Sequence, residues 1–312
     1  MVIDKSYTQS EFRGQIHCPA PVTPFSANGD LMLDAYEDML RYHLDTSADT
    51  MLLAGDNGEG YVLSEDELAQ VTETAARVIG ARFPFYVHVS RISTDESIAR
   101  ARAAADAGAN GICLTPHSYL GDGTRDEIVL RYEALAKAVA LPVMVYNCPK
   151  HTGINITTDT LEAICNVAPV NVLKEGNGVI EHATEVIGAF GHRFPVLIGL
   201  ARGLVPCLLL GSGGFVGTGP ELFGAGARRV FDAHTMTPDE RMEIHTRWGA
   251  VILAASFAGT SPAGIKSALN MLGLPAGVPR APVRALGPEA ETKLAADLVE
   301  NGVLEGAIAK RA

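Results

Sequence analysis

Short apolar stretches alternate with longer helical patterns along most of this chain, and that alternation limits the folds it can adopt. Strands that are nearly all apolar, each followed by a helix, are typical of parallel sheets covered by helices on both faces. The predicted strands are eight stretches at residues 16–25, 50–55, 84–90, 111–116, 142–148, 171–176, 195–199 and 214–218. The predicted helices between and after them cover residues 33–48, 64–81, 93–109, 125–140, 158–167, 179–191, 204–211 and 221–236.

Eight strand-then-helix units predict an α/β protein with a closed (β/α)₈ TIM barrel. A doubly wound open sheet is the alternative, but it usually has fewer strands. No glycine-rich phosphate fingerprint follows the first predicted strand, which also favours the barrel. Two helix starts carry capping boxes, from Ser64 to Glu67 and from Ser93 to Glu96.

The last part of the chain has a different pattern, with helices and no further strands. Thr237 as cap, Pro238 at the first helical position and Glu240 at the third begin a new helix. Helices are expected at residues 238–257, 262–272 and 288–302, with a Pro- and Gly-rich linker at 273–284. We therefore predict a catalytic barrel at residues 1–236 and a C-terminal helical appendage at residues 237–312.

The net charge and the lengths of the apolar runs limit the kinds of binding partner and the cellular compartment expected for this protein. The formal net charge is −11, which argues against a nucleic acid or an anionic membrane surface as the main partner. No apolar run is long enough to span a bilayer, and the polar N-terminus lacks the apolar core of a signal peptide, so we expect a cytoplasmic protein. The five cysteines are scattered without a CxxC pair, so neither a metal site nor a disulfide framework is indicated.

Lys174 is the strongest candidate for chemistry because it follows two apolar residues, Val172 and Leu173, of a predicted buried strand. Burial disfavours the ammonium form and favours a free amine, which can attack a ketone and form a Schiff base. A lysine that reaches solvent or pairs with an acid is the plainer alternative.

Other polar residues should gather at the same end, because active sites of barrels form where the strands end. Tyr146 closes the strand next to that of Lys174, and its hydroxyl is a plausible proton shuttle. The turn at residues 55–60 (GDNGEG) can point backbone N–H groups at a carboxylate. His88, His117 and His151 also follow strands, but no helix carries an HxxxH or HExxH pair, so no metal site is predicted.

Five motifs, in order, resemble those of the dihydrodipicolinate synthase / N-acetylneuraminate lyase family of class I, pyruvate-type aldolases. The turn 55–59 resembles the family's G-x-x-G-E loop, and Thr115-Pro116 resembles the T-P after the fourth strand. Residues 146–153 (YNCPKHTG) resemble Y-N-x-P-x-x-T-G, and Leu173-Lys174-Glu175 resembles the strand that carries the imine lysine. Residues 264–266 with 279–282 resemble the helical tail, so the similarity runs from Gly14 to about Leu286.

The resemblance implies a role for each matching residue. Lys174 would form the imine with pyruvate or another 2-oxo acid, Tyr146 would relay protons, and Asp56 would lie on the proton path. The substrate-binding set would be Gly55, Asn57, Gly58, Glu59, Thr115, His151 and Gly217. The resemblance also implies a homo-oligomer, dimer or tetramer, that needs no metal or organic cofactor.

Three departures from a true dihydrodipicolinate synthase change the expected reaction. Asp56 replaces a threonine of G-T-T-G-E, His117-Ser118 replaces a tyrosine pair, and His151 replaces the arginine of Y-N-x-P-x-R-T-G. The last change removes a bidentate carboxylate clamp, and a carboxylate at 56 suits a general base. We therefore expect a lyase, aldolase or dehydratase that cleaves, dehydrates or deaminates a hydroxylated 2-oxo acid.

Two alternatives stay open: the authentic synthase, which condenses pyruvate with aspartate semialdehyde, and a non-catalytic 2-oxo-acid binder on the same barrel. Retention of both Lys174 and Tyr146 favours an enzyme over a binder. A phosphate-binding barrel enzyme is disfavoured, because the turn at residues 199–203 offers little beyond Arg202.

Overall fold

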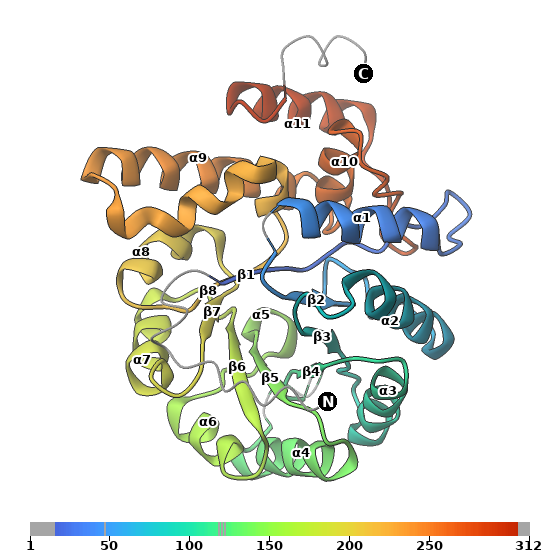
Figure 1. Cartoon of the computed structure of the whole chain (residues 1–312), viewed down its shortest axis with the longest axis vertical. Coiled ribbons are helices and arrows are strands. Elements are labelled where there is room, and N and C mark those ends of the chain that lie inside the picture. Colours follow the sequence, from blue (N-terminus) through green and yellow to red (C-terminus); the bar gives the residue numbers. More distant parts are fainter. Residues whose placement is uncertain (1–15, 47, 118, 120, 122, 305–312) are drawn as a thin grey trace.

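The computed structural model of the chain describes residues 16–46, 48–117, 119, 121 and 123–304. Gly14, Ser118 and the two ends of the chain, which belong to the predictions above, lie outside the described residues. The barrel strands, drawn from blue to yellow in Figure 1, are β1 (Ile16–Pro19), β2 (Met51–Leu53), β3 (Phe85–His88), β4 (Gly111–Leu114), β5 (Val143–Asn147), β6 (Val170–Glu175), β7 (Val196–Ile198) and β8 (Gly214–Gly217).

All the strand pairs are parallel, and the hydrogen-bonded order is β1-β8-β7-β6-β5-β4-β3-β2. β1 and β2 meet at the remaining seam, where the Asp49 N–H donates to the His17 carbonyl at 2.9 Å. The sheet is thus a nearly closed eight-stranded barrel, which confirms the predicted TIM barrel and excludes the open sheet. Tyr146 of β5 pairs with Lys174 of β6 in this register, as the sequence predicts.

Helices surround the barrel in the order expected (Figure 1). They are α1 (Leu33–Thr46), α2 (Glu65–Ile79), α3 (Thr94–Asp106), α4 (Arg125–Ala138), α6 (Thr158–Cys165), α7 (Ile180–Phe190) and α8 (Leu204–Leu209). The capping box of Ser64 and Glu67 is complete at α2, whereas Ser93 caps α3 by accepting only the Glu96 N–H. These caps satisfy N–H groups that the first helical turn leaves without partners.

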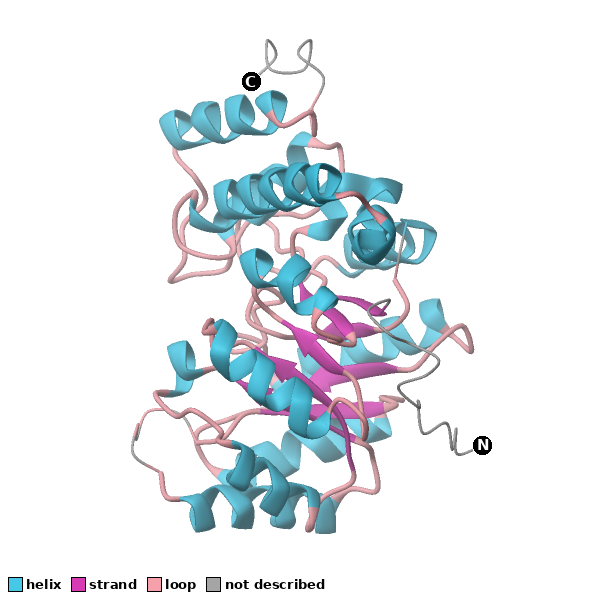
Figure 2. Cartoon of the chain, turned by 90° about the vertical axis from the view of Figure 1, so that its left-hand side faces the viewer, coloured by secondary structure: helices cyan, strands magenta, loops and turns pink. Residues whose placement is uncertain are grey.

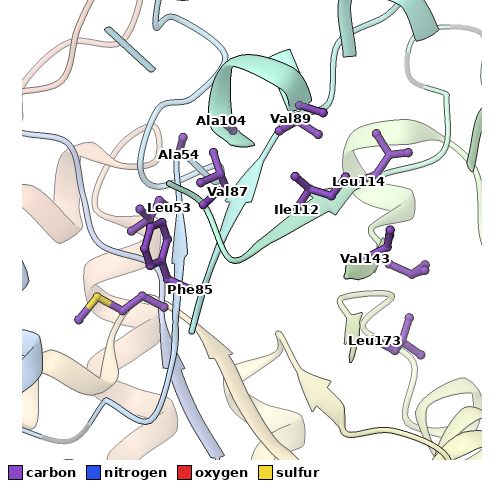
Figure 3. Close-up of a cluster of buried hydrophobic side chains, with 14 of the residues drawn as sticks. Leu53, Ala54, Phe85, Val87, Val89, Ala104, Ile112, Leu114, Val143 and Leu173 are labelled. Carbon is purple, nitrogen blue, oxygen red and sulfur yellow. The ribbon is translucent and has the colours of Figure 1, made fainter. Parts of the chain in front are cut away.

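The apolar strand residues divide between two cores because successive side chains point to opposite faces. Leu53, Phe85, Val87, Ile112 and Leu173 point outward and pack under the helices in one cluster (Figure 3). Their neighbours point inward and fill the barrel; they include Cys18, Leu52, Tyr86, Cys113, Met144, Tyr146, Val172 and Leu197. Cys18 and Cys113 therefore act as small buried hydrophobic residues.

Two predicted elements differ in extent or type, and two short elements were not predicted. The first strand ends at Pro19 rather than at residue 25, and Phe25 forms only isolated bridges to Leu31 and Val278. The predicted helix at 221–236 is a 3₁₀ segment, η2 (Pro220–Thr235), interrupted by Gly224 at φ 53°. A glycine at positive φ breaks the helical hydrogen-bond pattern, which explains the interruption at Gly224. Two short elements were not expected: α5 (Pro149–Thr152) and η1 (Ala201–Gly203).

The tail forms α9 (Pro238–Phe257), α10 (Ala263–Met271) and α11 (Pro288–Glu300), which gather at one end of the molecule in Figures 1 and 2. They share a buried cluster with Val22 and Met39 from the start of the barrel; its tail members include Val251, Ile265, Leu269, Leu294 and Leu298. The boundary between residues 236 and 237 stays a prediction. No helix in the described ranges has the length and apolar character needed for a membrane span.

Candidate active site

Lys174 lies near the carboxyl end of β6 and is 6% exposed. Its Nζ is 3.9 Å from the centroid of the Tyr146 ring, and within the described part of the chain it makes no hydrogen bond or ion pair. The lysine therefore neither reaches solvent nor pairs with an acid, which were the two plainer alternatives. The Nζ atom is thus left without a hydrogen-bond or ion-pair partner among the described residues.

Tyr146 connects the lysine to a chain of polar groups. Its Oη donates a 2.8 Å hydrogen bond to Asp56 Oδ2, and His151 Nδ1 lies 3.3 Å from the same oxygen. Burial and the Asp56 charge together raise the pKa of Tyr146 well above its ordinary value, so the phenol stays protonated near neutral pH. The His151 side chain is 44% exposed, so the chain of groups runs from the amine towards solvent.

The charges of Asp56 and His151 stabilise each other. Hydrogen bonding from His151 to Asp56, and next to the Cys148 sulfur, raises the pKa of His151 to about 10. Burial acts to raise the pKa of Asp56, but the hydrogen bond from His151 and the nearby Lys174 outweigh it and hold that pKa well below its usual range. Near pH 7 the pair is therefore a carboxylate and an imidazolium.

Cys148 completes this group and was not among the predicted site residues. It follows β5 directly, is 4% exposed, and its sulfur lies close enough to His151 and Tyr146 for both side chains to act on its pKa. Burial acts to raise its pKa, but those two side chains outweigh burial and lower it, whereas burial raises the pKa of the other four cysteines. Its position two residues after Tyr146 in the motif could have identified it from the sequence. A cysteine in a predicted strand is, however, first interpreted as a small hydrophobic residue of the core.

The turn at residues 55–60 lies beside this cluster and is tightly folded. Ala54 has a left-handed φ of 51°, and a Cβ on Gly60 would stand 1.9 Å from the Ala54 carbonyl oxygen. The Glu59 N–H donates to the Asp56 carbonyl and the Gly60 N–H donates to the Gly55 carbonyl, and these two hydrogen bonds close the turn. The N–H groups of Asn57 and Gly58 make no hydrogen bond within the described ranges, so they are the donors that a carboxylate would need.

Glu59 was predicted to bind substrate, but its side chain points away from the cluster. The carboxylate is fully buried, forms a 2.5 Å ion pair with Lys266 Nζ of α10, and accepts the Arg280 N–H at 2.8 Å. Lys266 Nζ also donates to the carbonyls of Thr23 and Val278. Only the backbone of Glu59 remains available to the turn, and its side chain connects the turn to the helical tail.

We expect Lys266→Met to lower the free energy of unfolding by about 3–5 kcal/mol, because it leaves the Glu59 charge buried without its ion-pair partner. Lys293→Met is the matched control: Lys293 is 78% exposed and pairs with Asp297 one helical turn away, so its loss should change that free energy by less than about 0.5 kcal/mol. Urea unfolding followed by circular dichroism measures both. Similar free energies of unfolding for the two variants would contradict this account of Glu59.

The remaining predicted residues are less closely tied to Lys174. Thr115 follows β4, where its N–H donates to Ser90 Oγ at 2.9 Å and its carbonyl accepts from Arg131. Gly217 ends β8, and Asn57 Oδ1 accepts from Ser261 Oγ at 2.7 Å. The structure thus brings Asp56, Tyr146, His151 and Lys174 together, whereas Thr115 and Gly217 form no hydrogen bond with them among the described residues. His117 lies apart, with Nε2 3.2 Å from the Glu127 carbonyl.

A second polar cluster, missed in the sequence, fixes the two strands that carry the site. Glu175, 3% exposed, accepts from Asn147 Nδ2 at 3.0 Å and from the Asn177 N–H at 2.6 Å. His182 Nδ1 of α7 lies 3.3 Å from the same carboxylate. These contacts link the ends of β5 and β6 and so hold Tyr146 against Lys174. No group of His, Cys, Asp or Glu side chains suited to a metal ion occurs among the described residues.

The barrel, with a buried lysine and a hydrogen-bonded tyrosine where its strands end, defines a barrel lyase of the aldolase class. Comparison with known proteins supports that class and narrows it. The model of the dihydrodipicolinate synthetase family matches residues 12–301, and the chain belongs to this family.

Relatives and solved structures agree with the family over most of the chain. The chain is 31% identical to 4-hydroxy-tetrahydrodipicolinate synthase 2 of Streptomyces coelicolor, across 91% of this chain and 94% of that protein. It is 28% identical to 4-hydroxy-tetrahydrodipicolinate synthase of Moorella thermoacetica, across 91% and 97%. The crystal structure of the synthase from Cyanidioschyzon merolae superposes with a TM-score of 0.85 at 26% identity, covering 94% of this chain and all of that one.

Proposed function

We propose that the chain is a Schiff-base-forming lyase that acts on a 2-oxo acid through Lys174. The observation that carries this proposal is the lysine itself: its Nζ is buried beside the Tyr146 ring and makes no hydrogen bond or ion pair with any described residue. A structural lysine in such a place would be paired with a carboxylate, as Lys266 is with Glu59.

In the cleavage direction, the neutral amine attacks the C2 carbonyl, and loss of one water with uptake of one proton from solvent gives an iminium. A base then takes the proton of the C4 hydroxyl as the C3–C4 bond breaks, and the electron pair of that bond forms an enamine with the neutral nitrogen. Protonation of C3 and hydrolysis of the imine release pyruvate and an aldehyde. No metal or organic cofactor enters this sequence.

Tyr146 and Asp56 are the proposed proton relay. As Tyr146 accepts the hydroxyl proton, it passes its own proton to Asp56 along their 2.8 Å hydrogen bond, and the reverse transfer returns a proton for C3. The imidazolium of His151 keeps Asp56 ionised and ready to accept. The N–H groups of Asn57 and Gly58 would hold the carboxylate of the substrate.

The proposed substrate is a hydroxylated 2-oxo acid, and the names of the relatives support the synthase as the second candidate. Asp56 and His151 favour the first candidate. His151 already pairs with Asp56, so the imidazolium is not a free clamp for the carboxylate of a semialdehyde. A cytoplasmic homo-oligomer is the expected form of the enzyme.

A substrate panel decides between the two candidates. Pyruvate with aspartate semialdehyde should give a much lower kcat/KM than 4-hydroxy-2-oxoglutarate or deoxy-sugar 2-oxo acids, measured in coupled assays. If the semialdehyde gives the highest kcat/KM of the panel, the chain is a synthase. If every compound forms an imine but none is turned over, the chain is a binder on an enzyme fold.

A further inference from the structure

His88, the last residue of β3, adjoins the site without taking part in the proposed proton relay. Its ring stands edge-on to the Tyr146 ring, with centroids 6.1 Å apart and planes at 72°. It is close enough to Asp56 and Lys174 for both charges to act on it. His88 therefore faces the same group of residues that we propose for catalysis.

His88 is half-buried, and its ring is neutral and incompletely satisfied. Burial lowers its pKa to about 4, so near pH 7 it is an uncharged imidazole with one donor and one acceptor nitrogen. Its Nε2 is buried and has no hydrogen-bond partner among the described residues. Polar atoms buried in this way normally find a partner, and one without a partner in the protein is explained when a ligand supplies it.

Other buried nitrogens also lack partners, but their surroundings differ. Both ring nitrogens of His43 on α1 are unpaired within the described ranges, and that ring contacts Tyr42, away from Lys174. His88 combines an unpaired nitrogen with direct contact to Tyr146, the residue that serves the substrate oxygen in the proposed reaction.

We propose that His88 is a specificity-determining residue whose Nε2 hydrogen-bonds a hydroxyl group of the substrate beside Tyr146. This inference rests on the proposed function and narrows its substrate class to 2-oxo acids with a hydroxyl near the bond that is made or broken. A site that pairs a buried polar atom with a substrate hydroxyl discriminates against the analogue that lacks it, because the atom is then left unpaired.

The test compares two acids that differ by one hydroxyl, 4-hydroxy-2-oxoglutarate and 2-oxoglutarate. Each is titrated against the full chain with borohydride, and the concentration that half-saturates labelling of Lys174 is read by mass spectrometry. The wild-type protein should prefer the hydroxylated acid by roughly tenfold, the size of one neutral hydrogen bond. His88→Ala should bring the ratio to within about twofold, whereas His88→Gln, which keeps polar atoms, should restore part of it.

His43→Ala is the control for loss of a buried imidazole and should keep the wild-type ratio. An unchanged ratio in His88→Ala overturns the inference, and if that variant does not fold, an unchanged ratio in His88→Phe does the same. Labelling of Lys174 by pyruvate separates the two proposals: if it persists while the ratio fails to change, only the role of His88 is lost. If no 2-oxo acid labels Lys174 in the wild-type protein, both proposals fail.

Discussion

Lys174→Ala is expected to reduce turnover of every 2-oxo acid to the background rate. The variant lacks the amine that forms the imine, and no other group in the cluster replaces that nucleophile. It should still fold, because Lys174 Nζ makes no hydrogen bond or ion pair with the described residues, so removing the side chain leaves no partner stranded. Steady-state rates and near-ultraviolet circular dichroism of the purified variant measure the two expectations.

Two further variants separate chemistry from charge. Lys174→Arg keeps a cation on β6 but forms no imine, so it should be as inactive as the alanine variant. Lys150→Ala removes an exposed lysine of α5 and should retain the wild-type rate. Substantial turnover by a folded Lys174→Ala protein would show that the reaction does not pass through this amine.

Tyr146→Phe is expected to lower kcat by roughly 10²–10⁴, the usual range for a general acid–base group. The change removes only the hydroxyl, so the ring stays against Lys174 and His88. Imine formation should therefore survive, and trapping with borohydride should label the variant about as well as the wild-type protein. A lower kcat with unchanged borohydride trapping is the result that identifies Tyr146 as a proton relay rather than as a packing residue.

Tyr132→Phe is the matched control, because Tyr132 is also a fully buried phenol and donates to the Leu114 carbonyl at 2.6 Å. It should lose about 0.5–1.5 kcal/mol of stability with its hydrogen bond and keep its kcat. If Tyr146→Phe keeps a kcat like that of the control, Tyr146 has no part in the mechanism.

The alternation of apolar strands with helices was enough to predict the barrel, because strands that are buried on both faces appear in the sequence as nearly continuous apolar runs. It also placed Tyr146 beside Lys174, since residues at the ends of neighbouring parallel strands meet at one end of a barrel. The short strand β1 and the 3₁₀ segment η2 were less predictable, because glycine conformation and packing set the ends of elements there.

Side-chain directions within the site were the part that sequence could not supply. Glu59 lies in a motif next to the proposed carboxylate donors, yet its partner is Lys266, from the far end of the chain. The pairing of Asp56 with His151 likewise depends on how two loops approach each other. The same is true of the contact of Asp56 with Tyr146 and of His151 with Cys148. Local patterns carry no information on such long-range contacts, so the motifs located the site without showing which side chains face it.

The central claim is that Lys174 forms a covalent imine with a 2-oxo acid, and reductive trapping tests it most directly. The protein is incubated with pyruvate and borohydride, digested, and the modified peptide is sequenced by mass spectrometry. The account predicts one added pyruvate-derived group, on Lys174 alone, and none on Lys266, whose amine is held by Glu59 and two carbonyls. Labelling of a different lysine, or none with pyruvate or any other 2-oxo acid, would contradict it.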